Sequence, residues 1–332
     1  MSTATNRPER AASESPAPRV AEQRVGTRIG LDPDGPRVVA LGGGYGLSAT
    51  LRATRQYASS ITGIVSVADD GGSSGRLRRA FGIPAPGDLR RCLVALAEPD
   101  SVWANAFEHR FAASELQGHP LGNIVIAGLT DTLGDFGAAI DEALRLLGGV
   151  GRVIPATAEP VTLKATYRRQ GGTAERPVSV EGIVEGEAKV GETSGLIGIT
   201  VVPPDPTVHE TALRAIRSAD QICIGPGSLF TSVLATVVVP AIREAVNSAK
   251  GKRVYICNLS EQHPETTGYD MAAHIEVLRA HDIEVDVVVH DPARLPLGRV
   301  PAGIEVAARP LADRSGRLHA PHLLAAALES LI

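Results

Sequence analysis

The sequence has few aromatic residues and no excess of positive charge. Aromatic residues make up 3% of the 332 positions, and the formal net charge is −4 at pH 7. Proteins that bind single-stranded nucleic acid stack bases on aromatic side chains, and general nucleic-acid binders carry a basic surface. The two shortages together argue against nucleic acid as a partner.

Cysteines and long apolar runs are also scarce. Cys92, Cys223 and Cys257 lie far apart and form no Cys-x-x-Cys pair, which argues against disulfides and zinc ligation. No apolar run approaches the roughly 18 residues that a transmembrane helix needs. The first residues lack the apolar core of a secretory signal. We therefore expect a cytoplasmic protein without a membrane span.

The composition is that of a folded chain with one atypical end. Hydrophobic residues amount to 43% of the sequence, which is enough for the core of one large domain or two ordinary ones. Residues 1–36 are rich in Ala, Pro, Glu and Arg with little hydrophobic periodicity, so we predict a disordered N-terminal tail there. Residues 37–332 are predicted to form an α/β domain.

Short apolar runs alternate with segments of helical period. Such alternation predicts a mostly parallel sheet with helices on both faces, that is, a doubly wound, Rossmann-like α/β fold. From about residue 158 to 203 the period changes to two, which predicts a small β-rich insertion added antiparallel to the main sheet. The runs predicted to be strands of the main sheet are 37–41, 61–68, 221–224, 253–257 and 284–290.

Four of these runs end in loops rich in Gly, Asp, Ser or Asn. In a parallel sheet the carboxyl ends of the strands share one edge, and ligands bind in the crevice outside it. Each loop alone is explained by an ordinary turn, but together they predict one large polar cleft. The loops are 42–46, 69–75, 225–228 and 258–262.

Two of the loops are candidates for binding phosphate. Backbone N–H groups at a strand-to-helix turn, together with the helix dipole, attract anions. The loop at 42–46 has Leu47 where a dinucleotide motif has its third glycine, and it lacks the Lys of a P-loop. In the loop at 225–228, Pro226 removes one donor. Either loop could instead be a tight or capped turn that binds nothing.

Asp69 and Asp70 follow the second strand. They could accept hydrogen bonds from ribose hydroxyls, hold a Mg²⁺ that bridges phosphates, or simply cap a helix. The glycines and serines that follow them supply further donors, which favours a ligand. Among the clustered arginines, Arg90 is the best candidate for pairing a phosphate, since it follows Pro86-Gly87-Asp88. Asn123 is a helix cap or a ligand contact.

No catalytic residue is assigned, and Mg²⁺ on Asp69 and Asp70 is the one metal site considered. The candidate ligand-binding residues are Gly42, Gly43, Gly44, Tyr45, Gly46, Asp69, Asp70, Gly71, Gly72, Ser73, Ser74, Asp88, Arg90, Asn123, Gly225, Gly227, Ser228 and Asn258.

Six stretches in order resemble one family, the YvcK-like gluconeogenesis factors of the CofD-like superfamily. The most specific are VADDGGSSGRLR at 67–78 and GPGSLFTSVL at 225–234, and the others lie at 38–52, 86–98, 118–123 and 255–269. The resemblance implies a cytoplasmic protein that binds nucleotide sugars of the UDP-N-acetylglucosamine type. It also implies a non-catalytic regulator of cell-wall precursor metabolism, needed for growth and cell shape under gluconeogenic conditions. Cell-wall enzymes and further copies of the chain are the partners that follow from it.

The resemblance also defines an alternative. CofD enzymes are Mg-dependent transferases that join a phospholactyl group to a deazaflavin, and their metal-binding acidic pair falls at Asp69 and Asp70. A 2-phospho-L-lactate transferase-like enzyme is therefore the second hypothesis, and a nicotinamide dehydrogenase, disfavoured by Leu47, is the third. The sequence departs from the family pattern at Tyr45, at Arg91 and at 318–320, so no ligand contact is assigned near the C-terminus.

Overall fold

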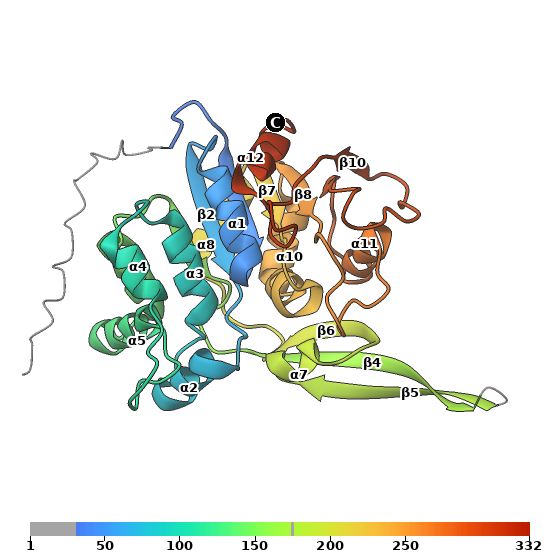
Figure 1. Ribbon diagram of the computed structural model, residues 1–332, viewed down its shortest axis with the longest axis horizontal. Coiled ribbons are helices and arrows are strands. Elements are labelled where there is room, and N and C mark those ends of the chain that lie inside the picture. The colour runs from blue at the N-terminus through green and yellow to red at the C-terminus, as the bar shows by residue number, and fades with distance from the viewer. Residues whose placement is uncertain (1–30, 174–175) are drawn as a thin grey trace, which may run out of the picture.

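The computed structural model describes residues 31–173 and 176–332, and its main element is a seven-stranded sheet (Figure 1). All neighbouring strands pair in parallel, in the order β10-β9-β8-β7-β1-β2-β3. This confirms the predicted Rossmann-like, doubly wound sheet. The strands are β1 Arg37–Gly42, β2 Ser60–Val65, β3 Arg152–Pro155, β7 Gln221–Ile224, β8 Lys252–Ile256, β9 Val287–His290 and β10 Glu305–Ala308.

The strands form because they are apolar on both faces and both faces are covered. β1 and β2 are buried from their second residue onward. The chain winds outward from β1 through β2 to β3, then returns to the other side of β1 and winds through β7, β8, β9 and β10. Since parallel crossovers are right-handed, this reversal places α1 (Gly44–Thr54) and α10 (Pro240–Ser248) on opposite faces.

The remaining helices flank this sheet, apart from α7, which lies beside the β-rich insertion (Figure 1). They are α2 Gly72–Phe81, α3 Gly87–Leu96, α4 Val102–Glu108, α5 Leu121–Leu133, α6 Phe136–Leu146, α7 Glu187–Gly191, α8 Glu210–Ser218, the π-helical segment η1 Leu229–Leu234, α9 Ala235–Val237, α11 Met271–Ala280 and α12 Pro321–Glu329. Within the described residues no single helix is long and apolar enough to cross a membrane. Leu229–Val237 and Pro240–Ser248 reach that length and composition only as a pair, which is bent by 76°.

The predicted β-rich insertion is present, but its placement was wrong in one respect. β4 (Thr162–Thr173), β5 (Arg176–Glu185) and β6 (Leu196–Val202) form their own antiparallel sheet in the order β5-β4-β6, rather than extending the main sheet. Alternate residues of β6 are buried, so one face of this small sheet packs on the body. A two-residue period specifies a half-buried strand but not the sheet to which it belongs.

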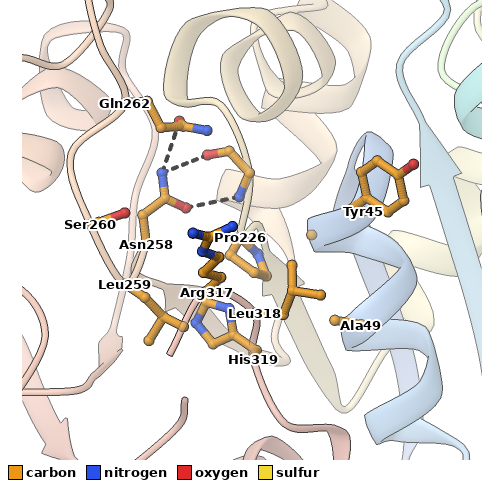
Figure 2. A pocket seen from close by; sticks show the side chains of 12 residues that line it. Tyr45, Ala49, Pro226, Asn258, Leu259, Ser260, Gln262, Arg317, Leu318 and His319 are labelled. Atoms are coloured by element: carbon orange, nitrogen blue, oxygen red, sulfur yellow. Dashed lines mark hydrogen bonds between the residues drawn. The ribbon is translucent and has the colours of Figure 1, made fainter. Parts of the chain in front are cut away.

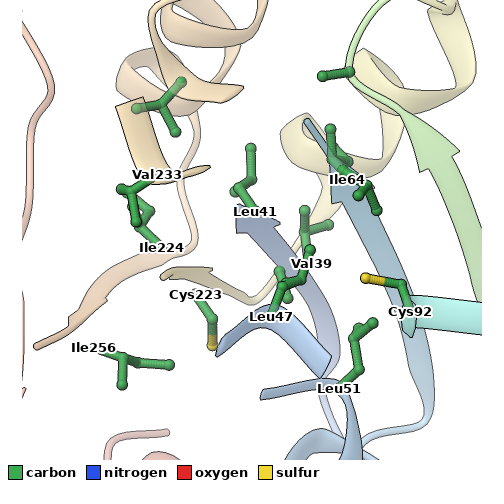
Figure 3. Packing of buried hydrophobic residues seen from close by; sticks show 14 of the residues in the cluster. Val39, Leu41, Leu47, Leu51, Ile64, Cys92, Cys223, Ile224, Val233 and Ile256 are labelled. Atoms are coloured by element: carbon green, nitrogen blue, oxygen red, sulfur yellow. The ribbon is translucent and has the colours of Figure 1, made fainter. Parts of the chain in front are cut away.

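One continuous apolar core lies between the main sheet and its helices. Figure 3 shows part of it, with Leu47 and Leu51 of α1 beside residues of β1 and β2. The three cysteines are free and buried, as the sequence indicates, and burial raises the pKa of Cys223 to about 12. Residues 1–30 of the predicted tail lie outside the described residues. From residue 31 onward the chain contacts the body, where the Asp32 N–H donates to the Ala58 carbonyl.

Candidate functional site

The four polar loops meet at one edge of the main sheet, as expected. They follow β1, β2, β7 and β8, which are four adjacent strands in the order β8-β7-β1-β2. The winding reverses between β1 and β7, and doubly wound folds bind their ligands at such a switch point. Two adjoining cavities open there, one of about 380 Å³ and one of about 170 Å³. We call them the large and the small cavity.

The two cavities differ in chemistry, although Tyr45, Gly46, Gly227 and Gln262 line both. The large cavity is polar and carries three carboxylates. Its other lining residues are Gly43, Gly44, Ser66, Asp69, Asp88, Arg91, Glu187, Ser228, Thr231 and Ser232. The small cavity has apolar walls and one cation (Figure 2). Its other lining residues are Ala49, Pro226, Asn258, Leu259, Ser260, Arg317, Leu318 and His319.

The glycine loop after β1 is needed for close packing at the start of α1. A Cβ at Gly46 would lie 2.1 Å from the Pro226 carbonyl oxygen, and one at Gly43 would lie 2.5 Å from an Asp88 carboxylate oxygen. Gly44 has a φ of +61°, which side-chain-bearing residues rarely adopt. The first turn of α1 therefore lies directly against the loop after β7, and the two predicted phosphate-binding loops form one surface.

Carboxylates of the protein already cap several helix N-termini at this edge. The Asp88 carboxylate lies beside Gly43 and Gly44 at the start of α1, and the Gly44 N–H lowers its pKa. At η1 the Phe230 N–H donates to Glu265 over 2.9 Å, and the Ser228 hydroxyl donates to the same carboxylate. Some of the N–H and O–H groups that were predicted to bind phosphate therefore donate hydrogen bonds to carboxylates of the protein itself. The N–H groups of Tyr45 and Gly46 still lack a carbonyl partner within α1, because the first turn of a helix offers none.

The loop after β7 is fastened to the loop after β8 by one side chain. Asn258 accepts a hydrogen bond from the Gly227 N–H over 3.0 Å and donates to the Gly227 carbonyl over 2.8 Å (Figure 2). Its amide also donates to the Gln262 side chain over 3.1 Å. Asn258 therefore holds the shared wall of the two cavities.

The structure separates Asp69 from Asp70. Asp69 lines the large cavity, whereas the Asp70 carboxylate accepts the N–H groups of Glu187 and Ala188, each over 3.1 Å, at the start of α7. Among residues 31–173 and 176–332, no three His, Cys, Asp or Glu side chains are grouped to hold a metal ion. The pair does not fit the shared Mg²⁺ that the transferase alternative requires.

The carboxyl groups of the large cavity influence one another. Burial raises the pKa of Glu187 to about 7, and the nearby charges of Asp69, Asp88 and Asp70 add to the rise while Thr231 opposes it. Burial also raises the pKa of Asp88, although Arg91 works against that rise. With a pKa of about 7, Glu187 changes its charge near neutral pH.

Three predicted site residues form a buried network behind the cavities. The Arg90 Nε donates to the Asn123 Oδ1 over 3.1 Å, and the Asn123 Nδ2 donates to the Ser73 Oγ over 3.1 Å. The same Ser73 hydroxyl lies 2.8 Å from the His119 Nδ1. Arg90 is 2% exposed and also pairs with Glu108 over 2.5 Å. This network fixes the start of α2 and lines neither cavity.

Half of the predicted site residues line a cavity and half lie outside both. The lining residues are Gly43, Gly44, Tyr45, Gly46, Asp69, Asp88, Gly227, Ser228 and Asn258. Those outside both cavities are Gly42, Asp70, Gly71, Gly72, Ser73, Ser74, Arg90, Asn123 and Gly225. Sequence reasoning missed Arg91, Glu187, Gln262 and Arg317. Arg91 and Gln262 had local signals: the arginine cluster in which Arg90 was chosen, and the polar loop 258–262.

Comparison with known proteins identifies relatives of this chain. Residues 38–300 match the profile of the CofD family, described as 2-phospho-L-lactate transferase CofD. A gluconeogenesis factor from Halalkalibacterium halodurans is 42% identical over 258 residues, which cover 76% of this chain and 77% of that protein. A relative from Nostoc sp. is 40% identical over 248 residues; the match covers 74% of this chain and 52% of that protein, about half its length. A crystal structure of a UPF0052 family member from Bacillus halodurans, 34% identical, superposes with a TM-score of 0.78 and covers 89% of this chain and 99% of that one.

Proposed function

The chain belongs to the CofD family and is a relative of the gluconeogenesis factors, and from this premise we propose that it binds a nucleotide sugar of the UDP-N-acetylglucosamine type without turning it over. In this proposal it acts in the cytoplasm as a regulator of cell-wall precursor metabolism, needed for growth and cell shape under gluconeogenic conditions. Cell-wall enzymes and further copies of the chain are its proposed partners.

The observation that carries the proposal is the junction of two unlike cavities at the switch point of the sheet. The small cavity offers Tyr45, Pro226 and Leu318 as apolar walls, with amides of Asn258 and Gln262 at its end. Bases are recognised in this way, by stacking on flat apolar groups and by hydrogen bonds to their edges. We therefore assign the nucleoside to the small cavity.

The junction between the cavities suits a diphosphate. Arg317, an exposed residue that lines the small cavity, forms no salt bridge within the part of the chain that the structure describes. The Gly46 N–H at the first turn of α1 adds a donor and the helix dipole. Guanidinium groups pair phosphate oxygens through two parallel hydrogen bonds. A diphosphate beside Gly46 would connect a nucleoside in the small cavity to a group in the large one.

The large cavity suits the sugar. Its carboxylates, Asp69, Asp88 and Glu187, accept hydrogen bonds, and its serine and threonine hydroxyls both donate and accept. A hexose presents many hydroxyl donors, so an acceptor-rich cavity matches it. Regulation without turnover is supported by two findings: the curated relative is described as a factor, and Asp69 and Asp70 do not converge on a common metal position.

Calorimetric titration with UDP-N-acetylglucosamine tests the proposal. We expect micromolar binding, and mass spectrometry should recover the ligand intact after long incubation. Arg317→Gln removes a charge-assisted contact and should weaken binding by about tenfold or more. Arg314→Gln, an exposed arginine of the same loop that lines neither cavity, is the matched control. Absence of binding would rule out the nucleotide sugar, and a new product would favour the transferase alternative.

The affinity should depend on pH through Glu187. Because its pKa is raised to about 7, the carboxyl is protonated at pH 6 and ionised at pH 8. The ionised form repels the diphosphate, as do Asp69, Asp70 and Asp88, while Arg91 attracts it. We expect the affinity for UDP-N-acetylglucosamine to fall severalfold between pH 6 and pH 8.

The variant Glu187→Gln provides the control for this pH effect. It keeps the size of the side chain and removes its ionisation, so its affinity should vary little over the same range. The diester-like diphosphate of a nucleotide sugar does not itself titrate there, so the ligand adds no pH dependence of its own. Parallel profiles for the wild type and Glu187→Gln would assign the pH effect to another group.

A further inference from the structure

Arg91 is the only positively charged side chain among the described residues that line the large cavity. It extends from the first turns of α3 toward the start of α1. Its Nη1 donates to the Asp88 Oδ1 over 2.6 Å, and its guanidinium lies over the Tyr45 ring, 4.6 Å from the ring centroid. Since Tyr45 lines both cavities, Arg91 lies next to their junction.

The surroundings keep Arg91 charged and oriented. Burial disfavours the charge of this side chain, but Asp88 and Tyr45 outweigh that penalty, so the pKa of Arg91 is raised. The Asp88 carboxylate in turn meets the N–H of Gly44. The Arg91 Nε is buried and has no hydrogen-bond partner. The guanidinium is thus clamped from two sides while it keeps donors that the protein does not use.

An anionic ligand in the large cavity needs a positive charge. Asp69, Asp88 and Glu187 would each repel a diphosphate there. In many nucleotide sites Mg²⁺ removes this repulsion. Here the Asp70 carboxylate is bound to the start of α7, and no three His, Cys, Asp or Glu side chains of the described residues are grouped to hold a metal ion. A guanidinium can supply the same charge and adds two directed hydrogen bonds.

We propose that Arg91 is the built-in cation of this site, which contacts the diphosphate on the sugar side and makes binding independent of a divalent metal ion. This inference rests on the proposed function. It adds that the positive charge of Arg91 balances the negative charges of the carboxylates in the large cavity. Tyr45 and Asp88 also orient Arg91, because each contacts its guanidinium.

The test compares UDP-N-acetylglucosamine binding in EDTA and in Mg²⁺. For the wild type we expect the same affinity in both buffers, within twofold. Arg91→Gln should weaken binding about 30-fold in EDTA, a loss typical of a charge-assisted, partly buried contact. Arg91→Lys keeps the charge but loses the paired donors, so its affinity should lie between the two. Arg52→Gln, an exposed arginine of α1 outside both cavities, should bind like the wild type.

Two results would overturn the proposal. One is a wild-type affinity that rises tenfold or more with Mg²⁺. The other is an Arg91→Gln protein that is folded by circular dichroism and binds within threefold of Arg52→Gln in EDTA.

Failure of the nucleotide sugar itself gives a different pattern, since no protein would then bind it in either buffer. In that case, titration of the protein with Mn²⁺ alone, followed by electron paramagnetic resonance, still tests whether the site binds a divalent cation. Arg91 as the built-in cation requires that the wild type leaves Mn²⁺ free at millimolar concentration. Specific Mn²⁺ binding by the wild type that is lost on Asp69→Asn would contradict it.

Discussion

Gly46→Ala should destabilise the protein by about 3 kcal/mol, the upper range for forcing an extra group into a well-packed interior. The added methyl group would lie 2.1 Å from the Pro226 carbonyl oxygen and 2.5 Å from the Pro226 carbonyl carbon. Both are backbone atoms, and Pro226 and the adjacent Gly227 form part of the cavity wall. The clash therefore cannot be relieved by rotating a side chain, and α1 or the loop after β7 must shift.

Urea unfolding followed by circular dichroism measures this loss. Gly128→Ala is the matched control, because Gly128 lies in the interior of α5, is exposed, and would place its new Cβ with nothing within 4 Å. Alanine has the better helix propensity, so this control should gain up to about 1 kcal/mol. Equal stabilities for the two variants would show that the contact between α1 and Pro226 is not rigid. A folded Gly46→Ala protein should also bind the nucleotide sugar more weakly, since both cavities share this wall.

Arg90→Met should cost about 2–4 kcal/mol of unfolding free energy, through lost hydrogen bonds and imperfect filling of the space. Arg90 is among the largest fully buried side chains, and a Cβ at Gly122 would already lie 2.9 Å from its Cδ. Methionine replaces the aliphatic stem but leaves the Asn123 Oδ1 without its donor. The Glu108 carboxylate is 43% exposed, so water solvates it after the change and it adds little to the cost.

The Arg90→Met variant also tests whether Arg90 supports the structure of the site or contacts the ligand. Arg90 lines neither cavity, so ligand affinity should fall only as far as the start of α2 moves. Arg52→Met, at an exposed position of α1, controls for the loss of one arginine and should stay within about 0.5 kcal/mol of the wild type. If Arg90→Met kept full stability and lost binding, Arg90 would instead contact the ligand.

The sequence located the four polar loops at one edge of the predicted sheet, and the structure brings them together there. Parallel strands place their carboxyl ends at one edge whatever their order, so polar loops after four of them had to meet if those strands were neighbours. The glycines of 42–46 indicated a phosphate-binding loop or a tight turn, and the structure adds that Pro226 packs against Gly46. These features depend on local geometry and chain direction, and the sequence carries both.

Neighbouring residues were harder to distinguish. Arg90 and Arg91 are adjacent on α3, but a helix turns by about 100° per residue. One is therefore buried behind the site, and the other lines the large cavity. Asp69 and Asp70 diverge in the same way, one to the cavity and one to the start of α7. Composition and spacing give the type of side chain, whereas its direction depends on the exact start of each element.

The sequence by itself determined the fold class, the edge of the sheet at which the polar loops lie, and the family, because periodicity, chain direction and motifs are read directly from the order of the residues. Only the tertiary structure decided which side chains line the cavities. Glu187 comes from the β-rich insertion and Arg317 from the loop before α12, and both are distant in sequence from the glycine loop that they join. Only long-range packing brings such residues together. Packing also places carboxylates of the protein at helix N-termini that the sequence analysis predicted to bind phosphate.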